Sequence, residues 1–315
     1  MSRVNAISIF ESEETQAKLN GIQAGIVENI QKKGVSFKLK SQNANLSDEN
    51  AGTYYFKRFQ NSESKAYGTA RTNNKGDLIT APEIPVSLDV DKEIVEEVAK
   101  KDAKRFGIDN SVLSIVEKRK GNHEMTLLAE LETAFFAKAV EEGTAISGID
   151  FSADIADQME EIIQSIETTK NKYVRGVPRD LIAIVCRPKV YGKLKNHLNN
   201  NYNANFSVAE EELPGLNGVA VFSNIYLPDD VDFVVMVKES IAQPTAIDEY
   251  NGERIPLSND FAVELFYSYG TKALAADLIK YGKIGTTVEP TPDTETTPDA
   301  EPTPDAGGNE DESNE

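Results

Sequence analysis

The sequence predicts an α+β protein, because segments with helical periodicity and segments with strand character both recur along its 315 residues. The clearest helix is 122–142, where Leu128, Leu131 and Phe135 recur at spacings of three and four. The clearest strand is the continuous apolar run 181–186, LIAIVC, which is typical of a buried central strand. With 39% hydrophobic residues, the chain can bury the core of one or two domains.

The helix at 122–142 has recognisable ends. Asn122 is a suitable N-cap, Glu124 lies in the first turn where the helix dipole favours a carboxylate, and Gly143 is a C-terminal stop. At 1.5 Å per residue such a helix runs roughly 30 Å. We read residues 111–121 as a short connector leading into it.

The N-terminal part predicts a helix and then an extended arm. Within residues 13–33 the apolar positions share one helical face, namely Leu19, Ile22, Ile26 and Ile30. Gly34 ends this helix. In residues 35–46 the pattern VSFKLK alternates apolar and polar side chains before turn residues follow, so we expect an extended arm lying across a surface.

Residues 53–86 predict a long two-stranded hairpin. Its two ends are rich in β-formers, whereas its middle consists of Asn, Ser, Lys, Thr and Gly with almost nothing to bury. The alternative is a floppy surface loop, since loops of this length are either functional or disordered. An isolated hairpin is marginal in water, so a protruding one implies a partner surface that supports it.

The rest of the chain alternates helices, strands and loops. We expect a helix at 91–106 and an amphipathic helix from Ser152, whose apolar positions are Ile155, Met159, Ile162 and Ile166. Arg187 and Pro188 open a further helix. The remaining expectations are a long polar loop from about 199 to 217, strands at 218–223 and 231–237, long β stretches from 241 to 274, and a closing segment at 275–280.

The charge is unevenly spread. The chain has a net charge of −19, of which residues 286–315 supply ten carboxylates and no Lys or Arg, leaving −9 on the body. This balance argues against a basic nucleic-acid reader, although not against a protein that encloses nucleic acid. The terminal segment repeats Pro, Thr, Asp and Glu without an apolar cluster, which predicts disorder.

No catalytic, cofactor-binding or metal-binding pattern stands out. Cys186 lies inside an apolar run, and His123 and His197 lack partners at metal-ligand spacing. No nucleophile elbow, Walker loop or dinucleotide fingerprint follows a strand, and the acidic clusters lie in polar loops. The chain has neither a signal peptide nor an apolar run long enough for a bilayer, so we expect a protein made and kept in a cytoplasm.

The order of parts resembles a known family. A helical and extended arm, a long hairpin, a long straight helix and an α/β domain follow one another, with the phrases IVCRPKVYGKLKN and YGTKALAADLIKYG in the last. Residues 2–285 thereby resemble the major capsid protein of tailed bacteriophages, whose Hong Kong-type fold is shared with encapsulin cages.

The resemblance implies a division of the chain. It assigns the following parts: an N-terminal arm at 1–50; a hairpin called the E-loop at 53–86; a peripheral domain at 87–144 and about 235–262, containing a spine helix at 122–142; an axial domain at 145–234 and 263–285; and a disordered acidic tail at 286–315. Because packaged DNA would repel ten inward carboxylates, we expect the tail to project outward.

The resemblance also implies a function. Such a chain is a structural protein, not an enzyme, and has no cofactor; it self-assembles into hexamers and pentamers of an icosahedral shell that encloses double-stranded DNA. The implied partners are other copies of the chain, a portal protein and the enclosed DNA, with no membrane. Because the chain starts directly at the arm without a long helical leader, any scaffolding protein is expected to be separate. The implied location is the virion, after assembly in the host bacterial cytoplasm.

The candidate contacts between subunits lie in the E-loop. They are Tyr54, Phe56, Lys57, Lys65, Asn74 and Lys75. Some family members cross-link an E-loop lysine to a neighbouring asparagine, but no partner motif for that chemistry is recognisable here. Three other functions stay open at this stage: an encapsulin-like shell that encloses an enzyme, a tail-tube or other virion component, and a non-assembling soluble α+β enzyme or binding protein.

Overall fold

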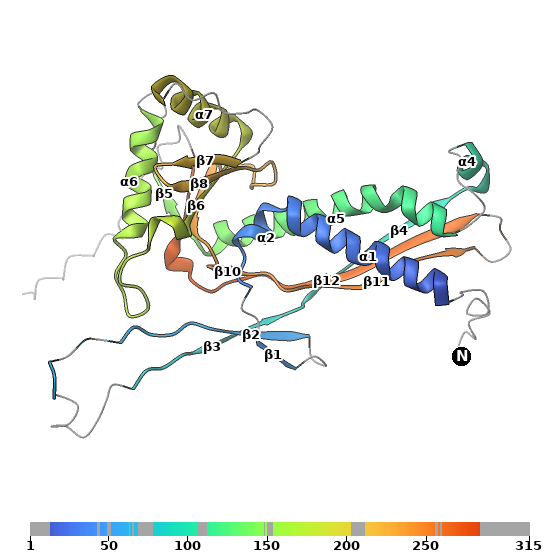
Figure 1. Ribbon diagram of the computed structural model, residues 1–315, viewed down its shortest axis with the longest axis horizontal. Helices are drawn as coiled ribbons and strands as arrows, with labels where there is room; N and C mark the ends of the chain where they lie inside the picture. Colours follow the sequence, from blue (N-terminus) through green and yellow to red (C-terminus); the bar gives the residue numbers. More distant parts are fainter. Residues whose placement is uncertain are drawn as a thin grey trace, which may run out of the picture.

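The computed structural model describes residues 13–42, 45–48, 52–62, 64, 66–68, 78–105, 112–147, 149, 154–202, 212–255, 258 and 260–283. The arm before residue 13, the tip of the hairpin and the acidic tail expected at 286–315 lie outside the described residues. Figure 1 shows three parts: an elongated layer of helices over a narrow sheet, an α/β unit at one end of it, and a hairpin extending away beneath both.

The described helices include one that is much longer than the others. Their bounds are α1 Glu13–Lys33, α2 Val35–Leu39, α4 Lys100–Arg105, α5 Val112–Glu142, α6 Ile155–Glu167 and α7 Pro188–Tyr202, with 3-10 turns at η1 Arg179–Leu181 and η2 Ala276–Leu278. The predicted helices at 13–33, from residue 152 and from residue 188 are confirmed. Asp154 caps α6 by accepting a hydrogen bond from the Ala156 N–H at 2.9 Å.

The long helix α5 begins ten residues before its predicted start. It has 31 residues, so the expected connector at 111–121 is wrong, as is the role of Asn122 as a cap. Ile115 and Val116 are fully buried and extend the apolar face of the helix. Gly121 lies in the helix interior with open space around it, so an alanine would fit there, and the glycine costs about 1 kcal/mol relative to that alanine.

The strands form four sheets. Their bounds are β1 Asn45–Asp48, β2 Thr53–Lys57, β3 Glu83–Ser87, β4 Val90–Val98, β5 Thr144–Ile146, β6 Ile182–Cys186, β7 Glu212–Leu216, β8 Val219–Ser223, β9 Phe233–Val237, β10 Ile241–Ala242, β11 Thr245–Arg254, β12 Phe261–Tyr269, β13 Lys272–Ala273 and β14 Ile279–Gly282. The sheet orders are β1-β2-β3, β10-β13, β11-β12-β4 and β5-β14-β9-β6-β8-β7.

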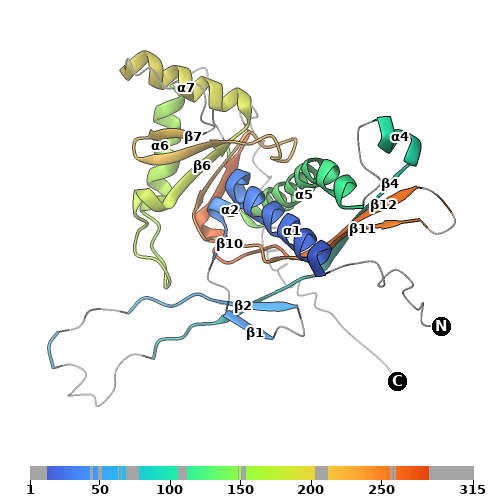
Figure 2. The ribbon, with the colours of Figure 1, turned by 45° about the vertical axis from the view of Figure 1, so that its right-hand side comes forward.

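The three-stranded sheet β11-β12-β4 supports the long helix α5. α1 and α5 cover one of its faces, and the buried residues between the layers include Ile26, Leu127 and Val263 (Figure 2). The helix predicted at 91–106 is wrong, since β4 occupies most of it and only the short α4 is helical. Ile94 and Val98 are four apart, a spacing that suits a helix face and a strand face equally. Pairing of β4 along β12 decides for the strand.

The six-stranded sheet forms the core of the α/β unit. Its central strand β6 is fully buried, as predicted, and runs parallel to β8 and antiparallel to β9. α6 and α7 pack on one face, while α2 and the C-terminal half of α5 cover the other, with Phe135 and Phe136 fully buried. The polar loop predicted at about 199–217 ends earlier than expected, because residues 212–216 form β7, which pairs antiparallel with β8.

The arm is more ordered than the alternation in its sequence predicts. Residues Val35–Leu39 form the helix α2 instead of an extended segment, and Val35, Ser36 and Leu39 are buried against the body. β1 then adds a third strand beside β2. Burial of three side chains on one side of a short turn favours the helix, whereas alternation would expose half of them.

The base of the predicted hairpin is confirmed. β2 and β3 pair antiparallel from Thr53↔Ser87 to Lys57↔Glu83, and Phe56, Val86 and Ala242 form a small buried cluster beneath them. Beyond this base the described parts of the two arms continue outward beneath the α/β unit (Figures 1 and 2).

Candidate assembly surfaces

No group of His, Cys, Asp and Glu in the described part of the chain is suited to hold a metal ion. None of the described helices is long and apolar enough to cross a bilayer. Burial raises the pKa of the Cys186 thiol far above its ordinary value, which makes it unreactive. The fully buried His123 lies edge-on to Tyr250, with its Nε2 atom 3.0 Å from Glu96.

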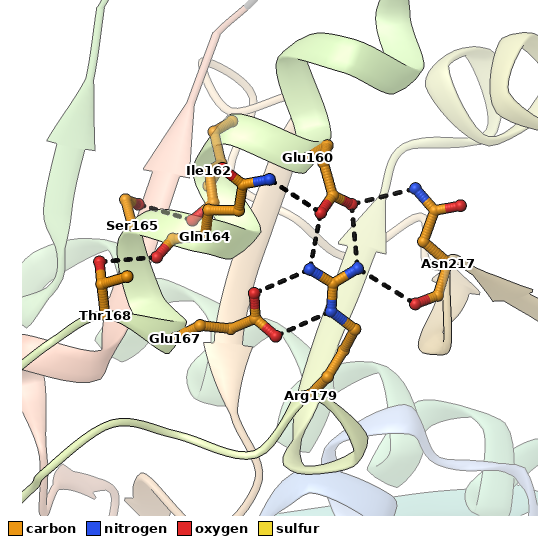
Figure 3. Close-up of polar contacts among 8 residues, drawn as sticks. All are labelled: Glu160, Ile162, Gln164, Ser165, Glu167, Thr168, Arg179 and Asn217. Atoms are coloured by element: carbon orange, nitrogen blue, oxygen red, sulfur yellow. Dashed lines mark hydrogen bonds and ion pairs between the residues drawn. The ribbon is translucent and has the colours of Figure 1, made fainter.

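An arginine clamp holds the α/β unit together (Figure 3). The Arg179 guanidinium donates to Glu167 through Nε and Nη2, both at 2.8 Å, and to Glu160 through Nη2 at 2.6 Å. Asn217, in the β7–β8 turn, donates from its Nδ2 to Glu160 at 3.0 Å. The clamp therefore ties α6 to η1 and to an edge of the six-stranded sheet.

The clamp also shifts the titration of its carboxylates. Hydrogen bonding to Arg179 holds the pKa of Glu167 below its ordinary value. Burial pushes the pKa of Glu160 upward, but its hydrogen bonds with Arg179, Asn217 and Gln164 outweigh burial, and the net shift is downward. Both carboxylates therefore stabilise the fold above their ordinary pKa and lose that contribution as the pH falls through their lowered values.

Replacing the clamp arginine gives a pH-dependent loss of stability. Arg179→Met is expected to lower the free energy of unfolding by about 1–2 kcal/mol at pH 7, because two partly buried carboxylates lose a charged partner. The deficit should shrink as the pH falls through the lowered pKa values of Glu160 and Glu167, because the two carboxylates then become protonated in the wild type as well. Urea unfolding at pH 7 and pH 3 measures it, with the exposed Arg105→Met as the control expected to change little. A deficit that is the same at both pH values would contradict this account.

The hairpin exposes apolar side chains that its own chain does not bury. Those with the largest exposed fractions are Phe59 (65%), Tyr67 (93%), Leu78 (88%) and Ile79 (49%). They lie on both arms of the hairpin, beyond the paired base. Exposed apolar side chains gathered on one protruding element mark an interaction surface.

The predicted contact residues have different surroundings. Phe56 is buried and anchors the hairpin within its own chain, and Tyr54 packs partly against the same cluster. Lys57 forms an exposed ion pair with Glu83 at 2.9 Å. Lys65, Asn74 and Lys75 lie outside the described residues.

The hairpin is basic, although the chain is acidic. Residues 57–77 contain five Lys or Arg and two Asp or Glu, so this stretch has a net charge of +3 on a chain of −19. The exposed apolar side chains therefore lie on a locally cationic element. A partner surface that fits it combines apolar side chains with carboxylates.

The outer face of the three-stranded sheet has that combination. The β4 side chains that point away from α5 are exposed, namely Asp91, Glu93, Val95 and Glu97. The register pairs Glu264 with Val95 and Phe266 with Glu93. This pairing brings one more carboxylate and one more apolar side chain, both half-buried, onto the same face. We call these six residues the acidic sheet face.

A buried carboxylate joins the arm, the long helix and the α/β unit. Glu132 of α5 accepts hydrogen bonds from the Ser36 N–H at 2.8 Å, the Ser36 hydroxyl at 2.7 Å and the Asn224 side-chain amide at 2.6 Å. Burial raises its pKa, and these hydrogen bonds only partly offset that shift. Gly34, at the start of α2, has no side chain that could cap the helix. Glu132 takes that role by accepting the hydrogen bond from the Ser36 N–H in the first turn.

Sequence reasoning missed Glu132, the acidic sheet face and the clamp. A signal for Glu132 was present, because it falls between Leu128 and Phe136 at spacings of four and so lies on the apolar face of its helix. The other two depend on which segments the fold brings together. Local patterns contain no such information.

Comparison with known proteins finds similarity in structure only. No protein-family model matches the chain, and no curated protein matches it. Among solved structures, the capsid of Ralstonia phage GP4 is 9% identical, with a TM-score of 0.54 over 80% of this chain and 88% of that one. The capsid structure of the cyanophage P-SCSP1u is 14% identical, with a TM-score of 0.52 over 79% and 85%. A virus-like particle from Pyrococcus furiosus is 8% identical, with a TM-score of 0.52 over 86% and 100%.

At such low identities these matches are evidence of fold. Each covers most of both chains, so the similarity extends beyond a shared motif. The described elements follow the order that the resemblance implied, from arm to hairpin to long helix to α/β unit. The chain has the α+β, Hong Kong-type capsid fold.

Proposed function

We propose that this chain is the major capsid protein of a tailed bacteriophage, and that it self-assembles into hexamers and pentamers of an icosahedral shell enclosing double-stranded DNA. The observation that carries the proposal is the protruding hairpin, whose exposed apolar side chains require a surface from another molecule. The capsid fold supplies the context, since phage capsids are among the matching structures.

The surface that receives the hairpin is the acidic sheet face of a neighbouring copy. The basic charge of residues 57–77 complements the carboxylates of that face, and Val95 and Phe266 offer apolar contact. Both surfaces are present on every copy, which is the condition for a repeating head-to-tail contact that closes into a ring.

In this proposal the hairpin is the E-loop, α5 is the spine helix, and the remaining elements divide into two domains. The peripheral domain comprises residues 87–144 with β11 and β12, because β12 pairs along its whole length with β4. The axial domain comprises the six-stranded sheet with α6 and α7, including all of β9. The boundaries between the two proposed domains therefore lie at the ends of strands, near residue 237 instead of 235 and near residue 270 instead of 262.

The proposed partners follow from the shell. They are other copies of the chain, a portal protein, a separate scaffolding protein and the enclosed DNA. The protein acts in the virion, after assembly in the host cytoplasm, and has no catalytic role. The acidic tail projects outward, away from the DNA phosphates.

A second candidate is a protein cage that encloses an enzyme instead of DNA. The similarity to a virus-like particle from Pyrococcus furiosus, over the whole of that chain, favours keeping it. Particles purified from cells distinguish the two, since phage heads contain DNA and cages contain protein cargo.

Charge reversal tests the proposed contact. Glu93→Lys with Glu97→Lys is expected to raise the concentration needed for assembly about tenfold or more, because like charges then face each other across the contact. Sedimentation velocity measures the assembled fraction. Adding Arg71→Glu and Lys75→Glu should restore assembly. Glu117→Lys, an exposed substitution on α5, is the control. Undiminished assembly of the doubly reversed sheet would contradict the contact.

A further inference from the structure

A second set of contacts fixes the hairpin to its own chain beyond the paired base. The Arg58 guanidinium donates to both carboxylate oxygens of Asp277, at 2.8 and 3.0 Å. Asp277 lies in η2, 219 residues away in sequence. Two parallel N–H to oxygen bonds fix the direction of a side chain as well as its distance.

The loop after α6 forms the other side of this contact. The ring of Tyr173 lies 4.6 Å from the Arg58 guanidinium carbon, and the Asn61 N–H donates to the Lys172 carbonyl at 2.9 Å. In Figures 1 and 2 this loop descends from the α/β unit to the outgoing arm of the hairpin. The arm is therefore bound by a side chain and by its backbone.

Hydrogen bonds of the Asn171 side chain shape the loop. Its Oδ1 atom accepts hydrogen bonds from the Tyr173 and Val174 N–H groups, at 2.8 and 2.9 Å. Its Nδ2 atom donates to Asp277 at 2.6 Å. One side chain thus shapes the loop and links it to the carboxylate that holds Arg58.

We propose that Arg58, Asp277, Asn171 and Tyr173 form a clasp that sets the direction of the hairpin in the unassembled subunit. Closed, the clasp holds the outgoing arm against the α/β unit. Open, it leaves the arm attached only through the β2–β3 ladder. Burial would raise the pKa of Asp277, but the Arg58 contact and the Asn171 hydrogen bond outweigh burial and lower it, so the carboxylate stays ionised in the closed clasp.

The role of the clasp in assembly rests on the proposed function. A hairpin that already points toward a neighbouring subunit loses less conformational freedom when it binds. The clasp therefore acts before the contact between subunits forms. The clasp itself is a property of a single chain and is measured separately from assembly.

Hydrogen–deuterium exchange of the full-length chain, kept below the concentration at which it assembles, tests the clasp. Asp277→Asn is expected to speed exchange of peptides covering residues 58–62 about fivefold to tenfold. Without the Arg58–Asp277 contact, the hydrogen bond from the Asn61 N–H to the Lys172 carbonyl opens more often. Arg58→Gln should have the same effect. The effect of the double variant should be smaller than the two single effects combined, because both substitutions remove the same Arg58–Asp277 contact and differ only in the Tyr173 and Asn171 contacts that each also affects.

Controls separate the clasp from general loosening. Lys57→Gln removes the neighbouring exposed ion pair with Glu83 and should leave exchange at 58–62 unchanged. Exchange of the buried strand β6 reports global stability and should not change in any variant. Unchanged exchange at 58–62 in both single variants, or additive effects in the double variant, would overturn the clasp.

Assembly of the same variants tests its role. If the clasp presets the hairpin, Arg58→Gln and Asp277→Asn require several-fold higher concentrations to assemble. Faster exchange at 58–62 with unaltered assembly would overturn the role while leaving the clasp in place. Failure of the wild-type chain to assemble would count against the proposed function alone.

Discussion

A chain in which residues 62–79 are replaced by Asn-Gly is expected to fold normally and to form no closed shells. The replaced segment contains Tyr67, Leu78 and Ile79, which are exposed in the single subunit and so contribute little to its core. The β2–β3 ladder and the contacts of Arg58 remain. Asn61 and the inserted Asn-Gly form a three-residue hairpin loop with glycine at the left-handed position, and the Gln60 N–H to Thr80 carbonyl hydrogen bond closes it.

The loss of assembly should be large. A subunit without its hairpin loses the apolar and cationic side of the proposed contact, so the concentration needed for assembly should rise at least about a hundredfold. Circular dichroism and thermal unfolding check the fold, and sedimentation velocity checks assembly. Leu181→Ser, at an exposed apolar residue outside the hairpin, is the control expected to assemble. Normal shells from the shortened chain would show that the hairpin is not an assembly element.

Glu132→Ala is expected to lower the free energy of unfolding by about 3 kcal/mol. The substitution leaves the buried Ser36 N–H and the buried Asn224 amide without their acceptor. Because these donors belong to the arm and to the α/β unit, the arm should also detach from α5. Urea unfolding measures the stability, and limited proteolysis after Lys32 and Lys33 measures the detachment. A loss below about 1 kcal/mol with an intact arm would contradict the junction.

The pH dependence of the junction has the opposite sign to that of the arginine clamp. Burial raises the folded-state pKa of Glu132 above its ordinary value of 4.5, so the folded chain binds this proton more readily than the unfolded chain. The stability of the wild type relative to Glu132→Gln should therefore rise as the pH falls from the raised value toward 4.5, and level off below it. Paired unfolding curves across this range measure the difference.

Sequence periodicity predicted the helices and strands whose own apolar pattern indicates which faces are buried. The run at 181–186 has apolar residues on both faces, which only a central strand requires, and α6 has its apolar residues on one side. For β4 the same reasoning failed, because a spacing of four suits either structure. The deciding contact, Val98 with Phe261, is made by a strand more than 160 residues away.

The candidate site was only partly predictable for the same reason. A hairpin with β-rich ends could be recognised, since the polar middle of the segment has almost nothing to bury. The contact of Arg58 with Asp277 and the acidic sheet face could not, because each arises from segments that are brought together only by the fold. Glu132 lies between these cases, as a carboxylate on an apolar stripe that the sequence displayed.

The most direct test of the central claim is negative-stain electron microscopy of the protein expressed alone and fractionated by size. A shell protein forms closed shells, or rings of five and six subunits at concentrations too low for shells to form. The nucleic acid content of particles from infected or lysogenic cells then distinguishes a phage head from a protein cage. A uniform monomer at every concentration, with or without added phage lysate, would contradict the assignment as a shell protein.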